Sequence, residues 1–148
     1  MSLLSRKGLL AIGAVVDIAL YSKAGPVSAR ALADRHKLPP RHLEPVLQAL
    51  VRHGILKGIR GPRGGYELAR ERRRISAGEV VRAADQGAES NGSLPQSPLI
   101  EEVVVPMIAT AERVFSDALG GITIDEMASR AELSENQPDS SKNDEYSI

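Results

Sequence analysis

The chain has no cysteine among its 148 residues, and its only aromatic residues are three tyrosines and one phenylalanine. Without thiols it can form neither disulfides nor thiolate metal sites. A core with so few rings must be built from Leu, Val, Ile and Ala, and a composition rich in Ala and Leu favours helices over strands. The length fits one domain, or one domain with an appendage, and the apolar content of 42% is enough for a globular core.

Long hydrophobic runs are also lacking. The most apolar run, residues 9–20, is too short to cross a membrane, and Asp17 interrupts it. No small-residue cleavage site follows this run, so we predict no targeting segment. The predicted location is therefore the cytoplasm, with no membrane partner.

The formal net charge is zero, but the two halves of the chain are oppositely charged. Residues 1–85 contain 16 Lys and Arg against 7 Asp and Glu, a net charge of +9, and residues 86–148 carry a net charge of −9. The basic half can approach a polyanion that repels the acidic half. The alternative is a chance imbalance on a solvated surface, and nine charges of opposite sign in each half argue against it.

Helical periodicity and end signals predict three helices in the basic half. The first covers residues 5–23 and ends at Gly25-Pro26. Ser28 is the predicted N-cap of a short second helix over residues 29–36.

The third helix is predicted to begin near Pro39 or Pro40, because proline is tolerated in a first helical turn. Gly54 suits the left-handed position that closes it, and Pro45 predicts a slight kink or a loosely formed helix start. Its inward face is predicted to carry Leu43, Val46, Leu47 and Leu50.

A β-hairpin is predicted after the third helix. Residues 55–59 and 66–68 have strand character and flank the turn-forming run Arg60-Gly61-Pro62-Arg63-Gly64-Gly65. No Gly-Lys-Ser/Thr and no helix follow this glycine-rich loop, so a nucleotide site is not predicted.

Two capping boxes organise the rest of the chain. Ser76 to Glu79 predicts a fourth helix over residues 77–85, and Thr123 to Glu126 opens a short helix that ends near Leu133. Between them, an apolar stripe predicts a long helix from Pro98 to Leu119, kinked at Pro106.

This order of elements is that of a mainly α winged helix-turn-helix fold with a two-stranded wing and a long C-terminal dimerisation helix. The long helix must bury its stripe, the winged domain covers only part of it, and symmetric pairing of two chains is the default solution. The predicted units are a DNA-binding domain (1–85), a flexible loop (86–97), the dimerisation and short capping helices (98–133) and a disordered acidic tail (134–148).

In this fold the start of the third helix enters the major groove, and the wing reaches the neighbouring backbone or minor groove. Arg41 can pair with a phosphate or guanine, and Glu44 can accept from a cytosine amino group; the alternative for Glu44 is a solvated carboxylate. For His42 we favour surface packing over phosphate donation or pH sensing. The predicted DNA-binding set is Ser28, Arg30, Pro39, Pro40, Arg41, His42, Glu44, Arg60, Gly61, Pro62, Arg63 and Gly64.

The wing arginines suit insertion into a narrow minor groove, although a plain hairpin whose arginines only confer solubility is the alternative. A basic run follows the wing and is interpreted either as a phosphate patch or as solvated charge. It consists of Arg70, Arg72, Arg73 and Arg74.

Three segments carry a family resemblance: Gly25 to Ser28, Leu43-Glu44 and Arg60 to Ala69. The chain, from residue 1 to about residue 133, resembles the winged-helix repressors that include the iron–sulfur cluster regulator, the nitrite-sensitive repressor and the cysteine-metabolism repressor. The resemblance implies a homodimer on a roughly palindromic operator. It also implies that Glu44 reads a base and Arg60 enters the minor groove, while Arg41 and His42 lie where the recognition helix meets DNA and Tyr66 is structural.

One departure from that family concerns the cluster. Many members place three cysteine ligands before the long helix, whereas residues 86–98 have none, and His36, His42 and His53 lie in the basic half. We therefore predict no cofactor and no metal, and we favour solvated carboxylates over a hard-cation site at Glu89, Glu101 and Glu102. The signal is left open between a small molecule, a partner protein and none.

The predicted function is sequence-specific regulation of transcription, most simply repression. The alternative is a winged-helix module that binds protein without reading DNA. An enzyme is not predicted, because the sequence offers no Ser/His/Asp set, metal-ligand spacing or nucleotide loop.

Overall fold

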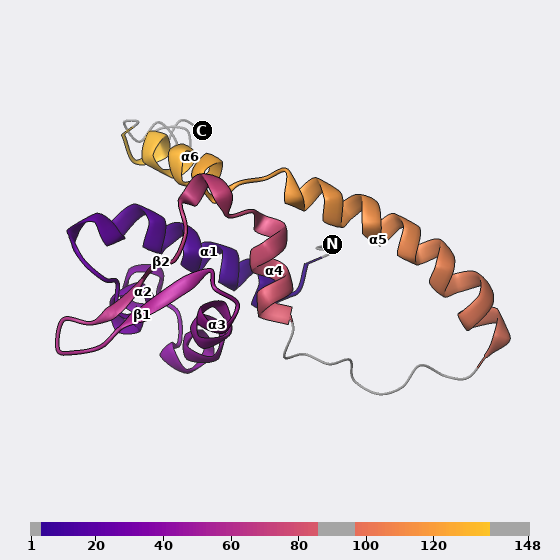
Figure 1. Ribbon diagram of the computed structural model, residues 1–148, viewed down its shortest axis with the longest axis horizontal. Coiled ribbons are helices and arrows are strands. Elements are labelled where there is room, and N and C mark those ends of the chain that lie inside the picture. Colours follow the sequence, from indigo (N-terminus) through magenta and orange to yellow (C-terminus); the bar gives the residue numbers. More distant parts are fainter. Residues whose placement is uncertain (1–3, 86–96, 137–148) are drawn as a thin grey trace, which may run out of the picture.

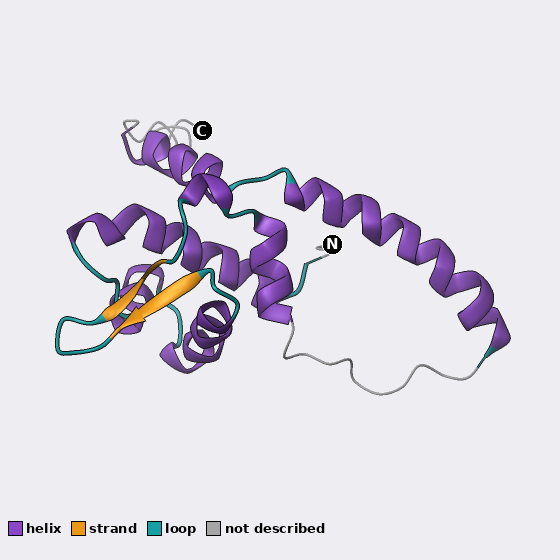
Figure 2. Cartoon of the chain, viewed as in Figure 1, coloured by secondary structure: helices purple, strands orange, loops and turns teal. Residues whose placement is uncertain are grey.

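The computed structural model describes residues 4–85 and 97–136 (Figure 1). Within these ranges the chain forms six α-helices and one two-stranded antiparallel sheet, so the fold is mainly α as predicted (Figure 2). Helices α1 to α4, α6 and the hairpin form one body, and α5 extends away from it (Figure 1). Residues 86–96 of the predicted loop and 137–148 of the predicted tail lie outside the described residues.

Helices α1 and α2 begin at serine caps. Helix α1 (Arg6–Tyr21) starts where Ser5 Oγ accepts from the Gly8 N–H at 3.0 Å, and the short 3₁₀ turn η1 (Ser22–Ala24) follows it. Helix α2 (Ala29–His36) starts where Ser28 Oγ accepts from the Ala31 N–H at 3.0 Å. The predicted cap at Ser28 is therefore confirmed.

Helix α3 (Pro40–Arg52) begins at the second of the two prolines and continues through Pro45. Gly54 follows the C-cap with φ +73°, the left-handed conformation predicted for it. The turn before α3 is closed by Lys37, which is left-handed at φ +54° although it carries a Cβ. No local signal in the sequence indicated this conformation at a lysine.

The wing pairs β1 (Leu56–Ile59) with β2 (Gly65–Leu68), from Leu56 opposite Leu68 to Ile59 opposite Gly65. The structure also pairs β2 with Val27, a backbone pairing that the sequence did not predict. The Val27 N–H donates to the Tyr66 carbonyl at 3.0 Å, and the Tyr66 N–H donates to the Val27 carbonyl at 2.8 Å. These two bonds tie the wing to the segment that leads into α2.

The second half begins with α4 (Ala77–Asp85), and its capping box is complete. The Glu79 N–H donates to Ser76 Oγ at 3.1 Å, and the Ser76 N–H donates to Glu79 Oε2 at 3.2 Å. At α6 (Ile124–Asn136), Thr123 Oγ1 accepts from the Glu126 N–H at 3.1 Å. This last helix passes its predicted end at Leu133, because helical bonding continues through three polar residues that were assigned to the tail.

The long helix takes the form of α5 (Val105–Gly120) preceded by one π-helical segment, η3 (Ile100–Val104). Pro106 has no N–H and its ring crowds the carbonyl of Glu102 four positions earlier. A π-helical segment directly before the proline accommodates that defect, and the kink predicted at Pro106 stays a prediction.

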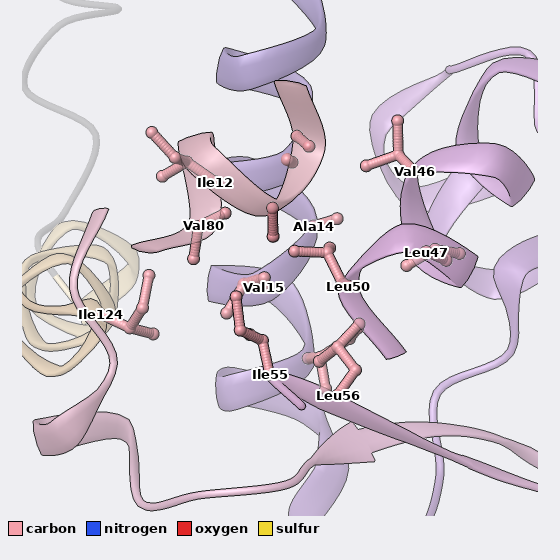
Figure 3. Packing of buried hydrophobic residues seen from close by; sticks show 14 of the residues in the cluster. Ile12, Ala14, Val15, Val46, Leu47, Leu50, Ile55, Leu56, Val80 and Ile124 are labelled. Atoms are coloured by element: carbon pink, nitrogen blue, oxygen red, sulfur yellow. The ribbon is translucent and has the colours of Figure 1, made fainter. Parts of the chain in front are cut away.

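The hydrophobic core lies between α1, α3, α4 and the start of α6 (Figure 3). Helix α3 contributes the inward residues expected from its periodicity, since Leu43, Val46, Leu47 and Leu50 are all buried. Val15, Val80 and Ile124 meet them from three other helices. This packing holds α3 and the wing in one body, which positions the surface described next.

Candidate nucleic-acid interface

The outer face of α3 carries polar side chains. Its inner face is buried in the core, so Arg41, His42 and Glu44 project into solvent. Within the described part of the chain, none of these three side chains has a hydrogen bond or ion pair. His42 lies on the surface of the first turn of α3, where the buried positions begin only with Leu43, and its packing role stays a prediction.

The wing tip is a tight turn held by its own backbone. The Gly64 N–H donates to the Gly61 carbonyl at 2.9 Å, and a Cβ on Gly64 would lie only 2.1 Å from the Ile59 carbonyl oxygen. Only glycine fits at Gly64, whereas Arg60 and Arg63 extend from the turn with exposed side chains. Neither arginine has an ion-pair partner in the described residues, so both are available to an external anion.

A groove of about 550 Å³ lies between the wing tip and the start of α2. Ser28 lines it from the α2 side and Pro62, Arg63 and Gly64 line it from the wing, so four of the predicted residues come together there. Arg30 is exposed on the first turn of α2, and Pro39 and Pro40 are exposed at the start of α3. The structure thus brings Ser28 together with the wing tip, and it leaves the other predicted residues on the surfaces of α2, α3 and the wing.

An ion-pair cluster that sequence reasoning missed holds α2 against α1. The Asp17 side chain is buried, and Arg35 binds it with two hydrogen bonds, Nε to Oδ2 and Nη2 to Oδ1, both 2.9 Å. His36 Nε2 contacts the same Oδ2, and the Arg35 guanidinium lies 4.0 Å from the centre of the Tyr21 ring. The hydrogen bond to Asp17 raises the pKa of Arg35, against the opposing effect of its partial desolvation.

This cluster orients the first helix of the helix-turn-helix, and with it the turn into α3. The sequence feature that could have revealed this cluster is Asp17, an aspartate inside the most apolar run. A charged residue on a buried helical face requires a partner, so that aspartate was a marker of a long-range ion pair.

The basic run after the wing forms intramolecular ion pairs. Arg70 Nη2 lies 3.1 Å from Glu79 Oε2, and Arg72 Nε lies 2.6 Å from Asp125 Oδ1. Arg74 reaches Glu71 at 3.9 Å, and Arg73, 83% exposed, only touches Asp125 at 4.0 Å. Carboxylates hold Arg70 and Arg72, so these two are not part of a free phosphate patch, whereas the side chains of Arg73 and Arg74 remain 83% and 80% exposed. On α2, α3 and the wing, Arg30, Arg41, Arg60 and Arg63 have no ion pair within the described residues.

A comparison with known families matches residues 4–130 to the Rrf2 model, described as an iron-dependent transcriptional regulator. The chain belongs to the Rrf2 family. It is 36% identical over 87 residues to the HTH-type transcriptional regulator IscR of Escherichia coli (strain K12 / DH10B). That match covers 59% of this chain and 54% of the relative, so it spans about half the length of the curated protein.

Solved structures extend the likeness over most of the chain. T. potens IscR has a TM-score of 0.72 and 29% identity, covering 91% of this chain and 92% of that one. CymR (YrzC), the global cysteine regulator of B. subtilis, has a TM-score of 0.66 and 26% identity, with coverages of 88% and 98%. This Rrf2 member has the winged-helix fold of its structural relatives, and the family and the relatives that it matches are described as transcriptional regulators rather than enzymes.

The family description mentions iron, and iron–sulfur clusters are held mainly by cysteine thiolates. There is no cysteine in the sequence, so the donor set does not fit a cysteine-ligated iron–sulfur cluster. Across residues 4–85 and 97–136, no three His, Asp or Glu side chains gather in a way that would hold a metal ion. The same ranges contain no helix long and apolar enough to cross a membrane.

Proposed function

We propose that this Rrf2 member binds double-stranded DNA as a homodimer and represses transcription from a roughly palindromic operator. The observation that carries the proposal is the set of exposed, unpaired polar side chains on the outer face of α3 and on the wing. Polar side chains without intramolecular partners are free to exchange water for phosphate and base edges.

The proposed roles follow from position and chemistry. The first turns of α3 enter the major groove, where Glu44 accepts from a cytosine amino group and Arg41 binds a guanine or a phosphate. Arg60 inserts into the adjacent minor groove. Ser28 and Arg30, at the N-terminus of α2, contact the sugar–phosphate backbone.

Homodimerisation is proposed from α5 and the segment before it. Leu99, Val103 and Met107 lie there with exposed fractions of 65%, 47% and 70%, and Ile108 and Val114 are exposed as well. An apolar surface this continuous requires a partner, and a second copy of the chain offers the same face in twofold symmetry.

Since a regulator of this class acts on the chromosome, the proposed place of action is the cytoplasm. The proposed signal is a small molecule or a partner protein, because the chain brings no thiolate for a cluster.

The decisive experiment is selection of bound fragments from a pool of genomic duplex DNA, at low and at near-physiological salt. Wild type is run beside Glu44→Ala and Arg60→Ala, with Arg73→Ala as the matched arginine control because its exposed side chain lies beside Asp125 of α6 and not on α3 or the wing tip. We expect wild type and the control to enrich one palindromic motif, with half-sites about one helical turn apart. A reporter under the selected motif then measures repression.

The two test variants should relax base preference, each by about 1–3 kcal/mol at the position it reads. Failure of wild type to enrich any motif at either salt would overturn the proposal. A winged-helix module that binds protein would then become the leading hypothesis, to be tested by a pull-down.

A further inference from the structure

Helix α5 is attached to the winged body at a compact joint. The segments that begin α4 and α6 pair as an antiparallel bridge between Ser76 and Thr123. The Ala77 N–H donates to the Ile122 carbonyl at 2.8 Å, and the Ile124 N–H donates to the Ile75 carbonyl at 2.9 Å. The two capping boxes therefore lie side by side and share one short piece of backbone pairing.

Packing closes the same joint. Ile75 and Ile124 are completely buried on either side of the bridge. A Cβ on Gly78 would lie 3.3 Å from the Gly120 nitrogen, so the start of α4 sits directly against the last residue of α5. The direction in which α5 leaves the body is thus decided within a few residues (Figure 1).

One side chain connects this joint to the wing. Arg72 belongs to the 3₁₀ turn η2 (Arg72–Arg74), four positions after the end of β2. Its Nε donates to Asp125 Oδ1 at 2.6 Å, and its Nη1 donates to Glu132 Oε1 at 3.4 Å, so it holds two turns of α6. The Arg72 side chain is 25% exposed and that of Asp125 is 28% exposed, which shields the pair partly from solvent.

Because α5 is long, a small change of angle at this joint moves the winged body over a large distance relative to the far end of α5. Helix α5 has 16 residues, about 24 Å at 1.5 Å per residue. In a dimer that pairs through α5, tilting each winged body on its joint moves the two α3 helices relative to one another. The separation of the α3 helices is the quantity that must match the spacing of two half-sites.

We propose that Arg72 is a positioning residue that fixes the angle between the winged body and the dimerisation helix, and thereby the half-site spacing that the dimer accepts. The proposal rests on the proposed homodimeric binding of DNA. Arg72 touches no base in this scheme; it acts through Asp125 and Glu132 on the direction of α5.

The absence of cysteine makes a direct measurement simple, because one introduced cysteine can be spin-labelled alone. Gln48→Cys places a label on an exposed position of α3, and the dimer then gives one distance between the two labels by pulsed electron paramagnetic resonance. The test variants in this background are Arg72→Gln, Asp125→Asn and the two combined. Arg73→Gln is the matched control, since it is a neighbouring arginine whose nearest carboxylate is at 4.0 Å.

We expect a narrow distance distribution for the Gln48→Cys parent and for the control. Arg72→Gln and Asp125→Asn should broaden it, and the combined variant should be no broader than either one, because both remove the same contact. On DNA, the preference of these variants for the native half-site spacing, relative to a spacing longer by one base pair, should fall about two- to fivefold. The effect is modest because the Arg72–Asp125 ion pair is partly exposed. Affinity for a single half-site should stay unchanged.

The outcomes distinguish failure of the proposed homodimer from failure of the proposed role of Arg72. If the labelled parent gives no dipolar signal, the chain is a monomer, and the homodimer and this proposal fall together. If the parent gives a narrow peak and Arg72→Gln leaves it narrow with spacing preference intact, only the role of Arg72 is overturned. Should Arg72→Gln unfold, Arg72→Lys keeps the charge and is expected to give an intermediate width, and a parental width for it would overturn the role.

Discussion

Gly65 shows how one residue determines whether the wing can meet the rest of the DNA-binding body. Its position opposite Val27 leaves no room for a side chain, since a Cβ there would lie 2.5 Å from both the carbonyl carbon and the carbonyl oxygen of Val27. The neighbouring Tyr66 makes the two backbone bonds to Val27 that tie the wing to α2. Any larger residue at 65 must break that pairing.

We predict that Gly65→Ala lowers the free energy of unfolding by about 1–3 kcal/mol and abolishes operator binding, because it displaces the wing from α2. Urea unfolding and fluorescence anisotropy with labelled operator measure the two effects. Gly58→Ala is the matched control, as it lies in β1 and its Cβ would meet nothing within 4 Å. Equal behaviour of the two variants would contradict the proposed steric role.

At the scale of single residues, local patterns place a side chain on its element but do not show which residue it pairs with. Glu44 and Arg60 were placed by periodicity and by turn residues, signals that extend over a few positions. Arg72 was assigned to a charge run, because its partner Asp125 lies 53 positions away and no local pattern connects them.

At the scale of elements, the capping box of α4 makes the stability of the fold depend on pH. Burial raises the pKa of Glu79, but the hydrogen bonds from Arg70 and from the Ser76 N–H, with the nearby charges of Arg70 and Arg82, outweigh it and lower the pKa overall. A carboxyl whose pKa is lowered by folding stabilises the native state at pH values above its ordinary value of 4.5. That stabilisation is lost as pH falls through the lowered pKa.

We therefore predict that acidification from about pH 5 destabilises wild type more steeply than Glu79→Gln, whose side chain does not titrate. Thermal unfolding followed by circular dichroism between pH 7 and pH 3 checks this. Glu71→Gln is the control, because that carboxylate is 77% exposed and its arginine lies at 3.9 Å. Parallel pH curves for wild type and Glu79→Gln would refute the prediction.

At the scale of the whole molecule, α5 exposes more apolar surface than the winged body can cover. We predict that Ile108→Asp converts the dimer to a monomer, raising the dissociation constant at least about tenfold, since a carboxylate would be buried against apolar side chains. Sedimentation equilibrium measures the change. Thr110→Asp, an exposed polar position two residues along the same helix, should leave the dimer intact. A dimeric Ile108→Asp protein would exclude this face as the interface.

The separation of charge along the chain predicts a steep dependence of DNA affinity on salt. The unpaired cations of α2, α3 and the wing should each release counterions on binding phosphate. Replacing Arg30 or Arg63 by alanine should reduce the slope of log K against log salt by about one per protomer. Replacing Arg74, which faces Glu71, should leave the slope unchanged in anisotropy titrations from 50 to 200 mM salt.

The sequence by itself determined the elements and their order: the Ser28 cap, the apolar face of α3, the Gly54 stop, the hairpin and both capping boxes. These signals act between residues a few positions apart, so they survive without knowledge of the fold. The tertiary structure alone decided that Asp17 binds Arg35 and His36, that Val27 pairs with Tyr66, and that the two capping boxes meet beside Arg72. These contacts depend on how elements pack to bury apolar surface, which brings together residues that no local pattern connects.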